Sequence, residues 1–222
     1  MLTKNIELAT KALKKEQIIG FPTETVYGLA GNAFSEKAIK NIFELKKRPF
    51  NNPLIVHISS MLQLHKVAIE IPEKAFMLAK HFWPGPLTFI LKKHPQIPML
   101  VTANQTTVAV RMPNHPMALR LLDQLNFPLV APSANPYQAI SPTKAEHVEQ
   151  YFKEQLHVIL DGGPCEHGIE STIVGFEGEN IIVYREGSVT IEQLEKITDK
   201  LTLKSNENHA PITPGMHSKH YA

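Results

Sequence analysis

Cysteine, tryptophan and long apolar runs are all scarce in this sequence. Its 222 residues include a single cysteine, Cys165, and a single tryptophan. One cysteine excludes an internal disulfide and a cysteine-rich zinc site, which is typical of a reducing compartment. No run of about 18 apolar residues is present, and the first residues lack the pattern of a secretory signal. These absences favour a cytoplasmic protein that does not enter a membrane.

The glycine signatures of the common nucleotide-binding folds are also missing. The 11 glycines form neither GxxxxGK[ST] nor GxGxxG. Any nucleotide phosphates would therefore be held by side-chain cations and helix N-termini. The net charge of +2 is a mild basic bias, weaker than that expected of a dedicated nucleic-acid binder.

What remains is ordinary for one large globular domain, with 43% hydrophobic and 20% charged residues. Hydrophobic periodicity and breakers predict helices at 5–16, 35–48, 61–71, 73–83, 117–125, 143–152 and 190–197, and strands at 18–21, 54–57, 87–91, 106–111, 128–131, 158–160, 171–176 and 181–185. Because these elements do not strictly alternate, we expect an α/β (α+β) fold. It would be a twisted mixed open sheet flanked by helices, not a doubly wound one. Residues 202–213 are polar and aperiodic, which predicts a domain at 1–201 and a linker tail at 202–222.

Three helix starts carry capping signals. Ser35 is a predicted N-cap, and Thr143 and Thr190 each stand three residues before a Glu or Gln, as in a capping box. A helix start of this kind also favours a bound anion.

The densest group of polar side chains lies in residues 20–58. Here a basic triplet at 46–48 ends a predicted helix, where cations are favoured by the helix dipole whatever their function. Two prolines then hold Asn51 and Asn52 in a turn before a strand that ends at His57. A rigid turn that presents Arg48, an amide and an imidazole suits a ligand that carries an anion.

Several motifs, in one order along the chain, resemble the YrdC-type family of L-threonylcarbamoyl-AMP synthases. They are PTETVYGL at 22–29, KxRP at 46–49 with PL at 53–54, PSAN at 132–135, and PGM with HYA between 214 and 222. Family members condense L-threonine, bicarbonate and ATP into L-threonylcarbamoyl-AMP and pyrophosphate. Another protein complex then transfers the threonylcarbamoyl group to tRNA. The resemblance implies a YrdC-like fold, a nucleotidyltransferase activity, and contact with tRNA that is indirect or weak.

The resemblance also implies a site, residue by residue. Matching positions for the threonine pocket are Thr25, His57, Arg111, Ser133 and Ser171. Those for ATP are Arg48, Asn52, Thr107, Asn135, Ser141, Thr143, Arg185 and Tyr221, and the catalytic set is Lys46, Arg48, Ser133 and Asn135. We expect Lys46 and Arg48 to be exposed cations that clamp phosphates. Magnesium would come with ATP and not on protein ligands, and positioning and charge would replace covalent catalysis.

The chain departs from the family pattern in two places. PYQA at 136–139 replaces the small, glycine-containing loop that the family leads us to expect. Longer members carry a second domain after a linker like residues 202–222, so the chain is either a piece of such a protein or a short form. In both cases we expect the tail to act as a lid over the site.

Other interpretations stay open on the residues alone. The basic triplet would also serve a non-catalytic RNA-binding translation factor, although few aromatics are placed for base stacking. Related domains of hydrogenase maturation proteins keep ATP but replace threonine with carbamoyl phosphate. Cys165 near His167 is weak evidence for a nucleophile, and the spacing of His217 and His220 is weak evidence for a metal site.

Overall fold

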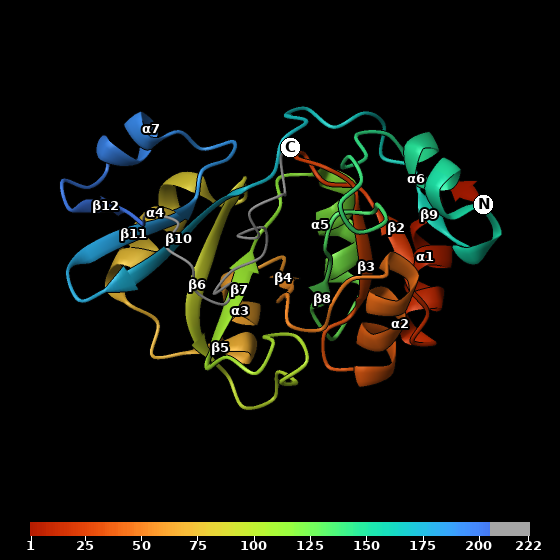
Figure 1. The fold of residues 1–222 in the computed structure, drawn as a ribbon, viewed down its shortest axis with the longest axis horizontal. Helices are drawn as coiled ribbons and strands as arrows, with labels where there is room; N and C mark the ends of the chain where they lie inside the picture. Colours follow the sequence, from red (N-terminus) through yellow and green to blue (C-terminus); the bar gives the residue numbers. More distant parts are fainter. Residues whose placement is uncertain (205–222) are drawn as a thin grey trace.

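The computed structural model describes residues 1–204, and their strands form one twisted mixed sheet (Figure 1). Its order is β1-β9-β2-β3-β8-β4-β7-β6-β10-β11-β12, and β5 pairs with β6 at the side. The strands are β1 (Leu2–Thr3), β2 (Ile19–Phe21), β3 (Gly28–Asn32), β4 (Ile55–His57), β5 (Ala68–Ile69), β6 (Leu87–Lys93), β7 (Thr107–Arg111), β8 (Leu129–Val130), β9 (Ile159–Leu160), β10 (Thr172–Glu177), β11 (Asn180–Arg185) and β12 (Leu201–Leu203). Both parallel and antiparallel pairs occur, which confirms the predicted mixed sheet.

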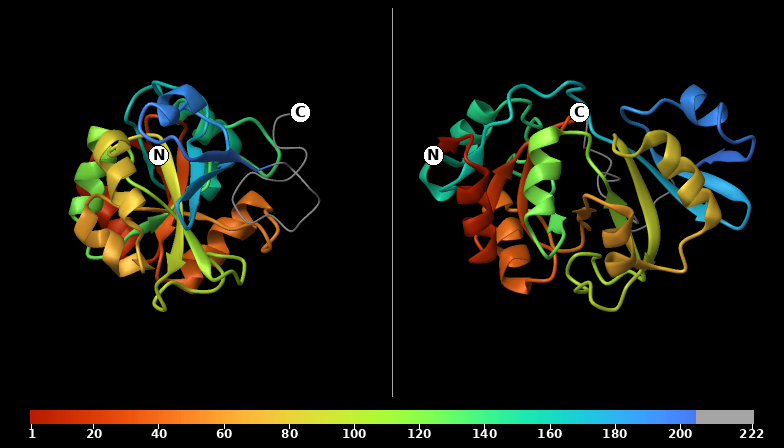
Figure 2. Two further views of the ribbon diagram at one scale, coloured as in Figure 1. Left: turned by 90° about the vertical axis from the view of Figure 1, so that its left-hand side faces the viewer. Right: turned by 180° about the vertical axis from the view of Figure 1, so that it is seen from behind.

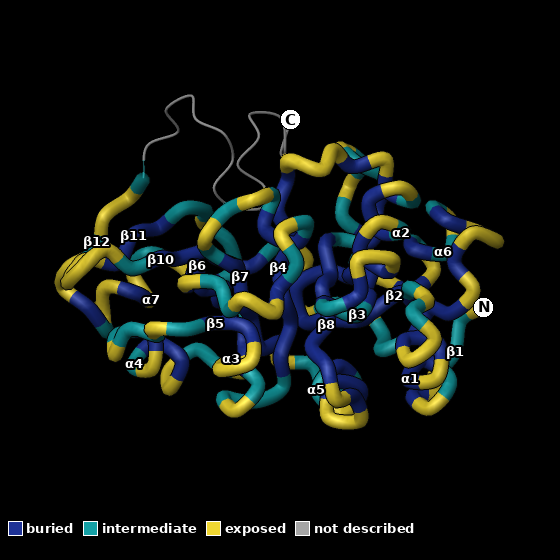
Figure 3. Tube along the Cα trace, turned by 90° about the horizontal axis from the view of Figure 1, so that it is seen from below, coloured by how far each residue is buried: buried dark blue, intermediate teal, exposed yellow. Residues whose placement is uncertain are grey.

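Helices cover both faces of this sheet. They are α1 (Ile6–Lys14), α2 (Glu36–Lys46), α3 (Met61–Val67), α4 (Glu73–Phe82), α5 (Pro116–Asp123), α6 (Ala145–Phe152) and α7 (Ile191–Glu195), with a 3₁₀ turn at Lys153–Gln155. Figure 2 shows α1 and α5 on one side of the sheet and α2 on the other. The neighbours Leu129 and Val130 of β8 accordingly belong to different hydrophobic clusters, because successive side chains of a strand point to opposite faces. Within the described residues, Figure 3 shows burial concentrated along the central strands.

Two of the three predicted helix caps are confirmed. The Ser35 side chain accepts a hydrogen bond from the backbone N–H of Ala38 at the start of α2, and Thr190 and Gln193 form the predicted capping box of α7. The third predicted cap, Thr143, was wrong. Helix α6 begins at Ala145 after Lys144, with no side-chain cap, because Thr143 belongs to the preceding loop, where its carbonyl accepts a 2.8 Å hydrogen bond from the Cys165 N–H.

Two predicted boundaries also change. The helix expected over 61–71 ends at Val67, because Ala68–Ile69 pairs with the edge of β6. Leu201–Leu203 pairs in parallel with β11, so the expected boundary after residue 201 falls inside a strand. Residues beyond 204, including Tyr221, His217, His220 and the expected lid, lie outside the described residues. Between residues 1 and 204, no helix is both long and apolar enough to cross a bilayer.

Strand pairing brings distant polar residues to one place in the sheet. The parallel pairing of β4 with β7 sets His57 beside Arg111, and the antiparallel pairing of β6 with β7 sets Thr88 opposite Arg111. A bridge joins Gly28 to Ser133. Residues from five segments between positions 28 and 133 therefore meet at one set of strand ends.

Candidate functional site

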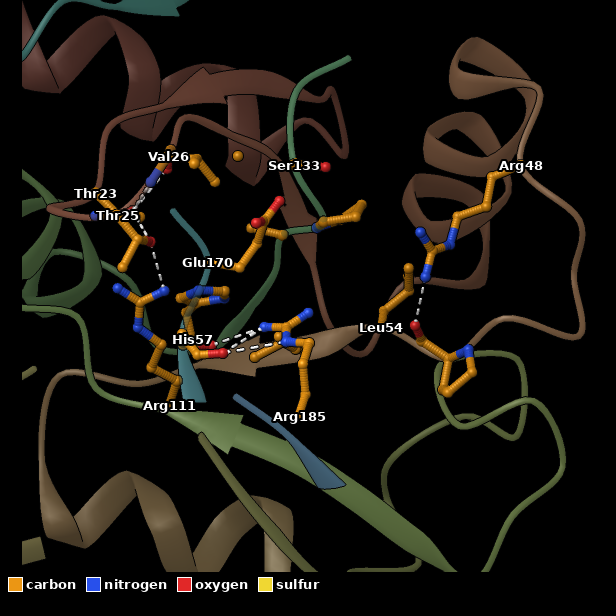
Figure 4. Close-up of a pocket in the computed structure, with 16 residues that line it drawn as sticks. Thr23, Thr25, Val26, Arg48, Leu54, His57, Arg111, Ser133, Glu170 and Arg185 are labelled. Carbon is orange, nitrogen blue, oxygen red and sulfur yellow. Dashed lines mark hydrogen bonds between the residues drawn. The ribbon is translucent and has the colours of Figure 1, made fainter. Parts of the chain in front are cut away.

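A pocket opens where these strand ends meet (Figure 4). Its lining residues are Thr23, Thr25, Val26, Gly28, Arg48, Pro53, Leu54, Ile55, His57, Arg111, Ala131, Pro132, Ser133, Glu170, Ser171 and Arg185. The structure therefore brings together all five residues predicted for threonine and two of those predicted for ATP, Arg48 and Arg185.

Arg111 is fixed on one side of the pocket by three neighbours. Its Nη1 donates to Thr25 Oγ1 at 2.9 Å, its Nε donates to the Gly85 carbonyl at 3.3 Å, and its Nη2 forms an ion pair with Glu24 at 2.7 Å. Arg111 and Glu24 are 4% and 3% exposed, so water screens this pair little. The guanidinium is thus held in one orientation, with its planar donors suited to a carboxylate.

His57 provides a neutral ring beside Arg111. Burial, with a further contribution from the Arg111 charge, lowers the pKa of His57 to about 3. Its ring and that of Phe21 form a T-shaped pair with 5.9 Å between ring centroids, and its Nδ1 has no hydrogen-bond partner among the described residues. At neutral pH this imidazole can exchange hydrogen bonds with a polar ligand but is a weak base.

Ser171 lies at the centre of a second hydrogen-bonded group. Its hydroxyl is 2.7 Å from Thr88 Oγ1, and Arg185 Nη2 donates to its carbonyl at 2.7 Å and to its Oγ at 3.2 Å. Arg185 Nε adds a 3.1 Å hydrogen bond to the same carbonyl. The start of β10 and the end of β11 therefore hold one cation and one hydroxyl at the pocket wall.

Arg48 lies at the other end of the pocket and is buried, contrary to the expectation of an exposed cation. Its Nη2 donates to Asn52 Oδ1 and, at 2.9 Å, to the Pro53 carbonyl, and its Nε donates to the Asn52 carbonyl. Burial lowers the pKa of Arg48 to about 10, which leaves it charged at neutral pH. Asn52 therefore holds Arg48 and is not itself among the lining residues.

Lys46 is the clearest departure from the predicted site. It is 1% exposed, and its Nζ donates to the backbone carbonyls of Ser133 and Asn135 and does not line the pocket. Burial, followed by the Arg48 charge, lowers the pKa of Lys46 well below its usual value. The prediction of an exposed clamp was wrong because the helix end that carries Lys46 is covered by the 132–135 turn.

The other predicted ATP residues lie around the pocket or away from it. Asn135 is bound by Lys46 and donates to the Ala139 carbonyl at 2.6 Å, which closes the unusual 136–139 loop. Ser141 donates to Glu170 at 2.6 Å. Thr107, at the start of β7, and Thr143 are not among the lining residues.

Sequence reasoning did not assign three polar residues of this region, Thr23, Glu24 and Glu170. Thr23 Oγ1 is 3.0 Å from Thr25 Oγ1, Glu24 pairs with Arg111, and Glu170 lines the pocket. Each stands within two residues of a predicted one, Thr25 or Ser171. That proximity was the available signal.

Cys165 is not placed as a nucleophile, since burial raises its pKa to about 12. At pH 8 the thiolate fraction should then be roughly a thousandfold below that of an ordinary cysteine, with alkylation slowed to match. We expect iodoacetamide to label native Cys165 at least a hundredfold more slowly than the denatured chain, as measured by mass spectrometry. Equal labelling rates would contradict the raised pKa of this half-buried thiol.

Comparisons with known proteins agree with this fold and pocket. The Sua5/yciO/yrdC family model, described as "Telomere recombination", matches residues 11–187. The threonylcarbamoyl-AMP synthases of Pyrococcus abyssi and Bacillus subtilis are 43% and 44% identical over 221 residues, which is 98% of this chain and 65% and 64% of theirs. The crystal structure of P. abyssi Sua5 complexed with L-threonine superimposes with a TM-score of 0.94 at 43% identity, covering 98% of this chain and 65% of that one.

The chain thus spans slightly under two thirds of the length of these relatives. E. coli YciO shares the fold, with a TM-score of 0.76 at 23% identity. Because the family model covers most of the chain and the similarity to these relatives extends over nearly all of it, the chain belongs to the Sua5/YciO/YrdC family.

Proposed function

We propose that this chain is an L-threonylcarbamoyladenylate synthase, a nucleotidyltransferase that forms L-threonylcarbamoyl-AMP and pyrophosphate from L-threonine, bicarbonate and ATP. The observation that carries the proposal is the pocket itself. It gathers Thr25, His57, Arg111, Ser133 and Ser171 in a chain whose relatives bear that name, one of them crystallised with L-threonine. The product would serve tRNA threonylcarbamoyladenosine modification through a separate transfer complex, in the cytoplasm.

Arg111 is the group suited to the threonine carboxylate. Its guanidinium is charged, buried and already oriented by Thr25 and Glu24, so little side-chain entropy is lost when it binds a planar anion. The neutral His57 and the hydroxyl of Ser171 offer hydrogen-bonding groups for the amino acid's polar atoms. These groups suit an amino acid that carries a polar side chain.

Arg48 and Arg185 are the groups suited to the phosphates of ATP. They lie in the same pocket as Arg111, and Figure 4 shows Arg48 on the side away from it. Among residues 1–204 no cluster of three or more His, Cys, Asp or Glu side chains could hold a metal ion. We therefore propose that magnesium enters on the ATP phosphates, whose oxygens and waters are ligands that it prefers.

The reaction needs placement more than a covalent intermediate. The threonine amine takes up carbon dioxide derived from bicarbonate, and one oxygen of the resulting carbamate attacks the α-phosphorus of ATP as the bond to pyrophosphate breaks. Arginines already in position lower the energy of the charge that develops on phosphorus. Magnesium, when bound with ATP, supplies further charge neutralisation.

Pyrophosphate release tests the proposal directly. Purified protein with magnesium and ATP should release pyrophosphate only when L-threonine and bicarbonate are both present. Equal release without threonine would contradict the synthase assignment. Tight RNA binding without ATP turnover would instead support the RNA-binding translation factor, and a requirement for carbamoyl phosphate would support the chemistry of the hydrogenase maturation domains.

A further inference from the structure

Glu170 has no role so far, although it lies in the pocket. Among the 16 lining residues it carries the single carboxylate, whereas three lining residues are arginines. In Figure 4 its carboxylate points into the middle of the pocket, with Thr25 and Arg111 on one side and Ser133 and Arg48 on the other. Arg111 on the first side is suited to the threonine carboxylate, and Arg48 on the second side is suited to the phosphates of ATP.

Both the backbone and the side chain of Glu170 are held in place. The Ser188 N–H and hydroxyl donate to its carbonyl at 2.9 and 3.1 Å. Ser141 donates to its Oε1 at 2.6 Å, which sets the direction of the carboxylate. The next residue, Ser171, is fixed by Arg185 and Thr88. A carboxylate anchored in this way reaches a bound ligand at one defined position.

The proposed reaction has to remove protons from threonine inside a positively charged pocket. An amino acid is taken from water with its amine protonated, and an ammonium has no lone pair with which to attack carbon dioxide. Nearby guanidinium groups disfavour that ammonium and so ease the loss of its proton. A group that accepts the proton must still be within hydrogen-bond reach.

Among residues 1–204, the charged and titratable groups around the pocket offer few candidates for that acceptor. They are Arg185 from β11, Arg48 and the buried Lys46 from the end of α2, Arg111 from β7, His57 from β4 and Glu24, whose carboxylate is already paired with Arg111. The arginines cannot accept a proton, and Lys46 points to the carbonyls of the 133–135 turn. With a pKa lowered to about 3, His57 is a weaker base than an ordinary glutamate carboxylate.

We propose, on the basis of the function proposed above, that Glu170 is the general base that deprotonates the threonine ammonium. One N–H proton passes to the Glu170 carboxylate, and the freed lone pair forms the N–C bond to carbon dioxide while one C=O pair moves onto oxygen. The nitrogen then loses its second excess proton to water, and Glu170 returns its proton to solvent. Dehydration of bicarbonate to carbon dioxide and water consumes one of these two protons, so carbamate formation releases one proton in total.

A substitution with a pH profile tests this role. Glu170→Gln keeps the size of the side chain but cannot accept the proton, so its threonine- and bicarbonate-dependent rate at pH 7 should fall by about a hundredfold or more. The ratio of variant to wild-type rate should then rise by up to about tenfold per pH unit, because free threonine amine becomes available from solution. Effects of pH on bicarbonate and ATP act on both proteins and cancel in the ratio.

The reverse half-reaction separates this role from a structural one. With L-threonylcarbamoyl-AMP and pyrophosphate as substrates, Glu170→Gln should form ATP within about threefold of the wild-type rate, since the P–O exchange needs no amine deprotonation. That result would also show that the variant is folded. Glu170→Asp retains a carboxylate, so its rate should depend on pH in the same way as the wild-type rate. This variant tests the proposal if Glu170→Gln does not fold.

Two further variants isolate the carboxylate. Glu166→Gln changes an exposed glutamate of the same loop and should leave both the rate and its dependence on pH unchanged. Ser141→Ala removes the hydrogen bond to Glu170, but its rate should depend on pH in the same way as the wild-type rate. A flat variant-to-wild-type ratio, or equal losses in both directions of the reaction, would overturn the proposal. If the wild-type protein itself shows no threonine-dependent turnover, the proposed function fails and this inference fails with it.

Discussion

Replacing Lys46 with alanine should lower the free energy of unfolding by about 3–5 kcal/mol and abolish pyrophosphate release. The side chain is 1% exposed, so alanine leaves a cavity where the long side chain packed. It also removes the ammonium that donates to the Ser133 and Asn135 carbonyls. Ser133 lines the pocket, so the loss of this support should disorder one wall of the site as well as weaken the fold.

Two comparisons make this prediction specific. Lys46→Met fills most of the volume but donates no hydrogen bond, so it should recover part of the stability and little of the activity. Lys47→Ala, at the exposed next position, should change the free energy of unfolding by under about 0.5 kcal/mol. Chemical denaturation of the three variants measures this. Loss of activity in Lys46→Ala at unchanged stability would show that the lysine acts on the substrate and not on the turn.

Local signals along the chain were sufficient for much of the fold. The caps at Ser35 and Thr190 depend on a few consecutive residues, and both were predicted correctly. Thr143 has the same pattern, but its loop is tied to Cys165 and the helix begins two residues later. The short strand Ala68–Ile69 continues a helical pattern and exists because the edge of β6 is available for pairing. Errors therefore arose where a distant segment supplied the competing partner.

The predictions of the site succeeded and failed for the same reasons. The family motifs predicted which residues gather in the pocket, and Thr25, His57, Arg111, Ser133 and Ser171 do line it. They did not predict burial, because the exposure of Lys46 is decided by a turn 87 residues away. Glu24 was missed for a related reason, since its importance depends on Arg111, which reaches it through the order of the strands and not through the sequence.

Glu24→Gln should destabilise the protein by about 3–5 kcal/mol at pH 7, because it leaves the Arg111 cation buried without its counter-charge. Glutamine keeps the size of the side chain, so the loss of stability measures the effect of the charge and not that of a cavity. Arg111 would also lose part of its orientation, which should raise the KM for threonine more than that for ATP. Glu166→Gln, at an exposed position, is the matched control and should leave both quantities unchanged.

The pH dependence of the same variant tests the ion pair separately. Burial alone would raise the pKa of Glu24, but the charge and hydrogen bond of Arg111, with backbone hydrogen bonds, lower the pKa below its usual 4.5. The unfolded chain therefore binds the proton first as pH falls, so the contribution is complete above about pH 5 and is lost as pH drops through the folded-state pKa. The stability gap between wild type and Glu24→Gln should accordingly narrow between pH 7 and pH 3, as followed by urea denaturation. A gap that stays constant over this range would mean that Glu24 contributes through packing and not through its charge on Arg111.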